Sequence, residues 1–188
     1  MVNVIAEIGI NFGGKIDVAK DLILQASRAG CWGVKFQFRN IETFYFVDNE
    51  IGDVIVRSEI EKNNLTFDEI LELQEYANSL ALEFGMSFFR VEDLDFYLGH
   101  IGDPDFYKVP SAECLNTKLV DSLLERDKKV LISSGGHKLE EVVNQYSSCK
   151  YKDLIILHCI ANYPADLGIQ NLSKIRKIAD THQSGYSS

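Results

Sequence analysis

Short apolar runs alternate with helix-like hydrophobic periods along this chain of 188 residues, and that alternation limits the possible folds more than any other feature. The runs predicted to be strands are residues 4–8, 33–38, 83–88, 106–109, 130–133 and 154–159. Between them, apolar residues recur with the spacing of amphipathic helices, over residues 19–26, 70–80, 94–98, 119–124, 139–146 and 172–179. Strands that alternate with helices in this way predict parallel βαβ units and an α/β fold.

Both a doubly wound sheet and a (β/α)8 barrel are built from such units. Polar residues end nearly every predicted strand, where a barrel assembles its site, and no GxGxxG or P-loop follows the first strand. These observations favour the barrel. A full barrel takes about 250 residues, and Gly185-Tyr186-Ser187-Ser188 resembles the opening of a seventh strand. We therefore expect one domain over residues 1–188, an incomplete (β/α)8 TIM-type barrel with six to seven βα units.

Two local patterns add detail to the predicted order of strands and helices. Thr66-Phe67-Asp68-Glu69 matches a capping box, which predicts a helix beginning just before Ile70. Residues 40–65 are polar and irregular, longer than an ordinary connection, and are predicted to form a functional loop.

Composition and charge exclude several classes of protein. Hydrophobic residues make up 46% of the chain, enough for one core, and no apolar run approaches the roughly 20 residues that span a bilayer. The net charge of -9 disfavours nucleic acid and anionic membranes as partners. The first residues lack the basic region of a signal peptide, so we expect none, and the four cysteines lack metal-site spacing. We expect reduced thiols and a cytoplasmic location.

Candidate functional residues gather at the predicted strand ends. They are Glu7, Asn11, Lys35, Gln37, Ser87, Lys108, Ser111, Glu113, Ser133, Ser134, Gly135, Gly136, His158, Asn162 and Tyr163. Lysines, hydroxyls and a glycine-rich turn can hold phosphate or carboxylate, and the two glutamates can transfer protons. Structural alternatives remain open: Glu7 could pair with a strand lysine, and Glu113 could be an ordinary acid at a helix start. His158 and Cys159 are adjacent in a strand and point to opposite faces, so they form no dyad.

With these motifs assembled, the chain resembles the N-acetylneuraminate (sialic acid) synthase family, which includes legionaminate and pseudaminate synthases. The matching segments are Ala6-Glu7-Ile8-Gly9-Ile10-Asn11, Val34-Lys35-Phe36-Gln37, Tyr107-Lys108-Val109-Pro110-Ser111-Ala112-Glu113, Ile132-Ser133-Ser134-Gly135, Leu157-His158-Cys159, Tyr163-Pro164 and Gly185-Tyr186-Ser187. Their order and spacing agree over nearly the whole chain.

The resemblance implies condensation of phosphoenolpyruvate with an N-acetylated amino-sugar aldehyde, with help from a divalent metal, Mn²⁺ or Mg²⁺. The residues that would surround the donor are Lys35, Ser87, Lys108, Ser111, Ser133, Tyr163 and Ser187, and Gln37 would be a further substrate-binding residue. Glu113 would lie near the reacting carbons and Glu7 on the sugar side. The family's homodimer is expected for the full-length protein.

The chain also departs from the family pattern. Phe12 replaces the usual histidine, Met86-Ser87-Phe88-Phe89 stands for Ser-Thr-Pro-Phe, and Ala161 and Asn162 occupy the place of the residue before Tyr-Pro. The family's metal-binding histidines follow the Gly-Tyr-Ser motif, so we expect no metal ligands in this chain. A Schiff-base aldolase and an inactive truncated homologue that only binds the donor stay open as alternatives.

Overall fold

The computed structural model describes residues 2–41, 54–147, 153–162 and 165–187. The chain divides into two compact units, Met1–Asp105 and Phe106–Ser188, and each is described by itself. The expectation that residues 1–188 form one domain stays a prediction.

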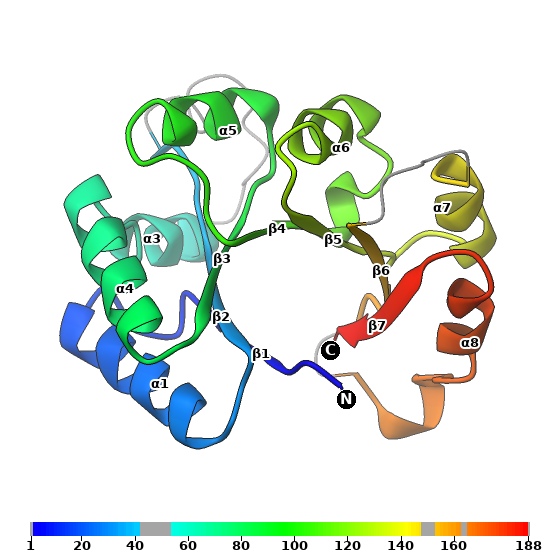
Figure 1. Cartoon of the computed structure of the whole chain (residues 1–188), viewed down its shortest axis with the longest axis horizontal. Helices are drawn as coiled ribbons and strands as arrows, with labels where there is room; N and C mark the ends of the chain where they lie inside the picture. Colours follow the sequence, from blue (N-terminus) through cyan, green and yellow to red (C-terminus); the bar gives the residue numbers. More distant parts are fainter. Residues whose placement is uncertain (1, 42–53, 148–152, 163–164, 188) are drawn as a thin grey trace. The chain divides into compact units, whose positions relative to one another are not determined.

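The first unit contains three parallel strands, β1 (Ile5–Gly9), β2 (Gly33–Gln37) and β3 (Glu83–Ser87), in that order. Its helices are α1 (Ile16–Arg28), α3 (Val54–Lys62), α4 (Phe67–Ser79) and α5 (Val91–Leu98). Within this unit the helices lie on one face of the strands (Figure 1). The register sets Glu7 opposite Lys35 and Lys35 opposite Gly85, so the three positions share the other face.

Helical periodicity explains why α1 and α4 cover the sheet. α1 buries Ala19, Ile23 and Ala26 at the spacing of one helix face. α4 begins at the predicted capping box, in which Thr66 Oγ1 accepts from Glu69 N and Glu69 Oε2 accepts from Thr66 N. This prediction is confirmed.

An aromatic cluster fixes the end of β2 against α4 and α5. The ring centroid of Phe38 lies 6.0 Å from that of Phe67, 6.0 Å from that of Phe88 and 5.2 Å from that of Tyr97. Because Phe38 points into this core, its neighbours Gln37 and Arg39 are left on the face that carries Lys35.

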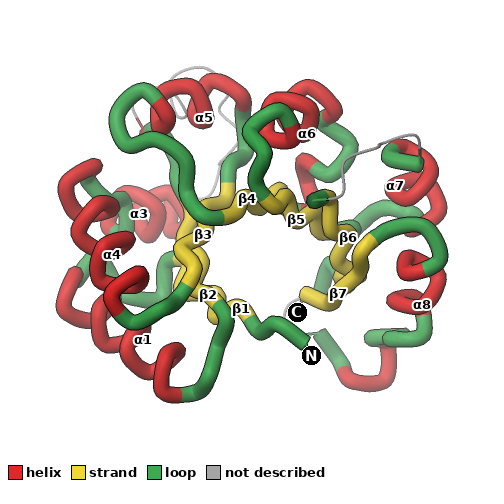
Figure 2. The backbone as a smooth tube through the Cα atoms, in the orientation of Figure 1, coloured by secondary structure: helices red, strands yellow, loops and turns green. Residues whose placement is uncertain are grey.

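The second unit contains the parallel strands β4 (Phe106–Val109), β5 (Lys129–Ser133), β6 (Leu154–Cys159) and β7 (Gln183–Ser187), in that order. Helices α6 (Thr117–Leu124), α7 (Leu139–Gln145) and α8 (Lys174–Ala179) lie on one face of these strands (Figure 2). Two 3₁₀ turns follow strands: η1 (Ser111–Glu113) after β4 and η2 (Leu167–Ile169) after β6.

The strands were predicted correctly to within a residue or two, and the expected seventh strand is β7. The prediction of an irregular loop over residues 40–65 is wrong in part, because helix α3 occupies Val54–Lys62. Its apolar residues recur too weakly for periodicity to mark a helix there. α5 begins three residues earlier than predicted, and α8 two residues later.

Candidate active site

Lys35 is the buried cation of the first unit. Its side chain is 8% exposed, while the neighbouring Val34 and Phe36 are fully buried. Lys35 Nζ lies 2.5 Å from Oε2 of Glu7 on β1 and donates a hydrogen bond of 2.6 Å to Oγ of Ser87 on β3. Three adjacent strands therefore meet at one ammonium group, and the expected pairing of Glu7 with a strand lysine is present.

Burial lowers the pKa of Lys35 from the ordinary lysine value, although contact with Glu7 opposes that shift. Removal of water disfavours the charged ammonium, and a single carboxylate that is 48% exposed does not fully compensate. A second anion beside Lys35 would favour its charged form. The arrangement is thus suited to holding an anionic ligand.

Gln37 and Gly9 shape the surroundings of Glu7. Gln37 Nε2 donates to Glu7 Oε1 over 3.4 Å. β1 is irregular between Glu7 and Gly9, and Gly9 has a φ of +53°. A Cβ at Gly9 would lie 2.8 Å from Glu7 Oε1 and 3.3 Å from Gln37 Nε2. A side chain at Gly9 would therefore displace the carboxylate of Glu7, a constraint that sequence reasoning missed.

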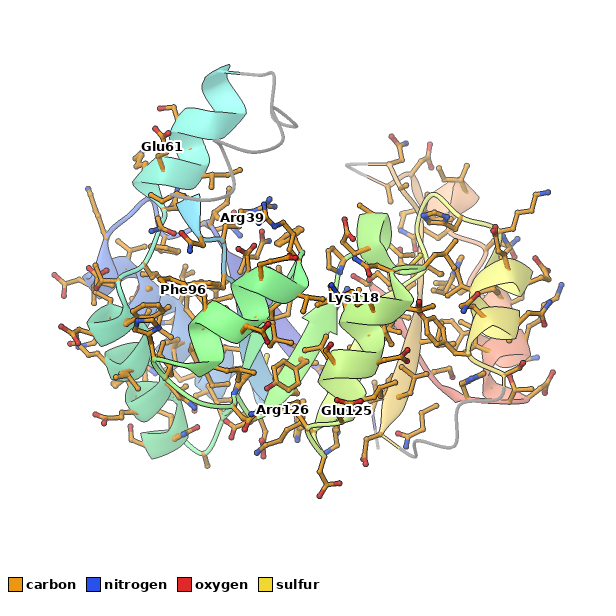
Figure 3. The ribbon with its side chains drawn as sticks, turned by 90° about the horizontal axis from the view of Figure 1, so that it is seen from above. Arg39, Glu61, Phe96, Lys118, Glu125 and Arg126 are labelled. Atoms are coloured by element: carbon orange, nitrogen blue, oxygen red, sulfur yellow. The ribbon has the colours of Figure 1, made fainter. Side chains whose placement is uncertain are left out.

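Sequence reasoning also missed Arg39. Residues 35, 37 and 39 alternate along the chain, which predicts that Arg39 shares the strand face of Lys35 and Gln37. Its guanidinium carbon lies 3.6 Å from the ring centroid of Phe89, a cation–π contact. With Gln37, Arg39 lines a small pocket whose other residues are Ile10, Ile60, Asn63 and Asn64. Figure 3 shows Arg39 and Glu61 of α3 at the same end of this unit.

Phe12 and Asn11 have structural contacts at the start of the connection after β1. Phe12 is 2% exposed and packs edge-on against Phe36, with ring centroids 6.1 Å apart. Asn11 donates from N and Nδ2 to the carbonyl of Ile8. Where the family usually has histidine, this chain therefore places an aromatic core residue.

Lys108 is the buried cation of the second unit. It is 7% exposed on β4, and its Nζ donates to the carbonyl of Val109 over 2.7 Å. The strand register places Ser133, Cys159 and Ser187 on the same face as Lys108. This unit therefore sets a lysine, two hydroxyls and a thiol on one face of its strands.

His158 lies on the opposite face and takes no part in this group. Its Nε2 is 2.7 Å from the carbonyl oxygen of Gln170, and its ring centroid is 6.2 Å from that of Tyr186. The adjacent Cys159 belongs to the face of Lys108. The prediction that this pair forms no dyad is confirmed, and the structure decides which of the two faces the candidate site.

Glu113 is held by the start of the following helix. Glu113 Oε2 accepts a hydrogen bond of 2.9 Å from Asn116 Nδ2, and Asn116 Oδ1 accepts from Leu119 N over 3.2 Å as the cap of α6. Asn116 thus links the helix cap to the candidate catalytic carboxylate. Its position before the apolar residues of α6 is the signal that could have indicated it.

The turns after β4 and β5 meet at Ser111. Its Oγ accepts a hydrogen bond of 3.1 Å from Gly135 N. Ser134 is buried and donates through Oγ to the carbonyl of Leu157, which makes it a structural residue. Tyr163 lies outside the described residues, and its predicted role stays a prediction.

A model of the NeuB family matches residues 22–188, which is most of the chain. The chain belongs to the NeuB family. The resemblance to sialic acid synthases is thereby confirmed.

Relatives of this NeuB-family chain carry related names. It is 30% identical to the N,N'-diacetyllegionaminic acid synthase of Legionella pneumophila, over 98% of the chain and 56% of that protein. It is 29% identical to the N-acetylneuraminate-9-phosphate synthase of Drosophila melanogaster, over 99% of the chain and 53% of that protein. The chain therefore spans little more than half the length of these curated relatives.

Solved structures identify the fold. The N-acetylneuraminic acid synthetase of Leptospira borgpetersenii matches with a TM-score of 0.83 and 26% identity, over 100% of this chain and 65% of that one. The spore coat polysaccharide biosynthesis protein SpsE of Bacillus subtilis matches with a TM-score of 0.81 and 27% identity, over 100% and 52%. The predicted fold class, an incomplete (β/α)8 TIM-type barrel, is confirmed. The described residues contain seven parallel strands that alternate with helices.

The part of this NeuB-family chain that the structure describes shows neither a metal-binding group nor a membrane-spanning helix. Within it, no three His, Cys, Asp or Glu side chains come together as a metal-binding group. None of the helices described there is long and apolar enough to cross a bilayer.

Proposed function

We propose that this chain is part of an enzyme that condenses phosphoenolpyruvate with an N-acetylated amino-sugar aldehyde, N-acetylmannosamine or a related sugar. The products would be a nine-carbon sialic-acid-type sugar acid and phosphate. The observation that carries the proposal is the buried Lys35 of β2, held between Glu7 of β1 and Ser87 of β3 in a NeuB-family chain. A buried lysine with a lowered pKa gains most when an anion joins it.

The donor carries a phosphate and a carboxylate, and two lysines suit this charge. Lys35 and Lys108 are proposed to counter the two anionic groups. The proposed polar contacts are Gln37, Ser87, Ser111, Ser133, Tyr163 and Ser187. The burial of both lysines supports these roles, because an anion beside a buried ammonium group stabilises its charged form.

In the proposed reaction, C3 of the enol attacks the aldehyde carbon, and positive character develops at C2. Water then adds at C2, and the C2–O bond to phosphate breaks, which leaves the new ketone and inorganic phosphate. Glu113 is proposed to accept the proton of that water, because Asn116 restrains its carboxylate. Glu7 is proposed to contact the sugar hydroxyls. The Glu113 carboxylate can also stabilise the positive character at C2, while the lysines hold the anionic donor in register.

The divalent metal, Mn²⁺ or Mg²⁺, would polarise the aldehyde oxygen in this chemistry. The described residues provide no ligand set for it, so no step above depends on it. A homodimer and a cytoplasmic location are further parts of the proposal.

Phosphate release by the full-length protein with a panel of N-acylated amino-sugar aldehydes, with and without Mn²⁺ or Mg²⁺, tests the activity. We expect release only when donor and acceptor are both present. Calorimetric titration with phosphoenolpyruvate tests the donor site, and we expect Lys35→Met to weaken binding about 10- to 100-fold, since it removes a charge-assisted contact. Lys20→Met is the matched control, because Lys20 pairs with Glu72 on the exposed helix surface. No release with any acceptor would contradict the proposal.

A Schiff-base aldolase is the second candidate, since the lowered pKa of Lys35 favours the neutral amine that such chemistry needs. Borohydride reduction in the presence of pyruvate separates the two. A stable adduct on Lys35 favours the aldolase, whereas phosphate release without trapping favours the synthase.

A further inference from the structure

Three strand ends of the second unit meet at one glycine. Gly135 is buried in the turn after β5, and its N–H donates to Oγ of Ser111, which follows β4. A Cβ built on Gly135 would lie 2.8 Å from Ser111 Oγ and 3.1 Å from Sγ of Cys159 at the end of β6. The backbone of Gly135 thus closes against two side chains from neighbouring strands.

The hydrogen bond from Gly135 sets the direction of the Ser111 hydroxyl. A serine hydroxyl has one O–H donor and two lone pairs. Because the N–H of Gly135 occupies a lone pair, the O–H of Ser111 remains a donor for another group. A donor at this position suits an oxygen of an anionic ligand.

The need for glycine here is steric. The φ of Gly135 lies outside the left-handed region, so alanine is compatible with its backbone. The contact of 2.8 Å is closer than real Cβ atoms approach, so Ser111 would have to move to admit a methyl group. Gly136, next in sequence, differs because its φ of +79° favours glycine through the backbone.

We propose that Gly135 is a positioning residue for donor binding, which holds the Ser111 hydroxyl in place through its N–H and its lack of a side chain. This inference rests on the proposed function, in which Ser111 contacts phosphoenolpyruvate. Gly135 acts through Ser111 and does not itself bind the donor. Cys159 supports the arrangement from the third strand end.

The test is a double-mutant cycle on the affinity for phosphoenolpyruvate, measured by calorimetry. We expect Gly135→Ala to weaken binding about tenfold, the loss of one hydrogen bond to a charged group. Ser111→Ala should weaken binding by a similar factor. In the Ser111→Ala background, Gly135→Ala should have less than a twofold effect, because the hydroxyl that it displaces is gone. A structural defect would instead add to the loss caused by Ser111→Ala.

Gly168→Ala is the matched control, since its Cβ would meet Asp166 Oδ1 at an ordinary 3.4 Å and its φ is also compatible with alanine. We expect it to bind the donor as the unmodified protein does. If Gly135→Ala fails to fold, the double variant with Ser111→Ala is expected to fold, and its failure to fold would overturn the inference. Full additivity, or normal binding by Gly135→Ala, would also overturn it. If the unmodified protein does not bind phosphoenolpyruvate, the proposed function itself fails.

Discussion

Glu7 and Lys35 face each other across adjacent parallel strands, with 2.5 Å between Oε2 and Nζ, yet one is half exposed and the other almost fully buried. The two partners therefore contribute differently to stability. The buried ammonium depends on the carboxylate, whereas water can solvate the carboxylate.

Removal of Glu7 should destabilise the fold more than removal of Lys35. We expect Glu7→Ala to lower the free energy of unfolding by about 1–2 kcal/mol, because it leaves a buried charge uncompensated. Lys35→Met should stay within about 1 kcal/mol of the unmodified protein, since it replaces the charge with an apolar chain. Urea unfolding measures both free energies. A larger loss for Lys35→Met than for Glu7→Ala would contradict the inference that the buried ammonium depends on the carboxylate.

The lowered pKa of Lys35 predicts a pH dependence of stability. The unfolded chain holds the Lys35 proton up to its ordinary pKa of 10.5, whereas the folded chain releases it at lower pH. Between these two pKa values the unfolded state binds more protons, so this group makes the free energy of unfolding rise with pH. Below the lowered pKa, the cost of burying the charge is present in full.

The corresponding measurement is the difference in the free energy of unfolding between the unmodified protein and Lys35→Met as a function of pH. Groups common to both cancel in this difference. We expect the difference to move in favour of the unmodified protein as the pH rises toward 10.5. A difference that stays flat would show that Lys35 titrates alike in both states.

Alanine substitutions at Gly9 and at Gly13 can be compared directly, because the two glycines have similar backbone conformations. Both have a positive φ, +53° and +61°, so alanine should cost about 1–2 kcal/mol of backbone strain at either position. At Gly9 the methyl group would also meet Glu7 Oε1 at 2.8 Å, whereas among the described residues none comes within 4 Å of the corresponding position at Gly13. Thermal unfolding should show a larger loss for Gly9→Ala, and equal losses would argue against the close packing around Glu7.

Asn116 has two roles that substitution can separate. Asn116→Ala removes the cap of α6 and should lower the free energy of unfolding by about 1 kcal/mol. Asn116→Ser keeps a capping oxygen but loses the amide that donates to Glu113. We expect near-normal stability with reduced turnover for Asn116→Ser, measured as phosphate release. Normal turnover in that variant would show that Glu113 does not need this restraint.

The sequence predicted what depends on local pattern. Strands and helices follow from the hydrophobic period, and the capping box at Thr66 from the donors left unpaired at a helix start. The buried lysines could be recognised because each is flanked by apolar strand residues. Weak periodicity concealed helix α3, since periodicity detects a helix only where one face is apolar.

What the sequence alone determined is therefore the order of strands and helices and the residue types at the strand ends. Only the tertiary structure decided which groups touch: Lys35 with Glu7 and Ser87, Ser111 with Gly135, and Glu113 with Asn116. It also decided that Cys159 rather than His158 faces Lys108's side of the strands. The physical reason is that periodicity states which residues share a face within one element, whereas contacts between elements depend on strand register and on close packing around glycines such as Gly9 and Gly135.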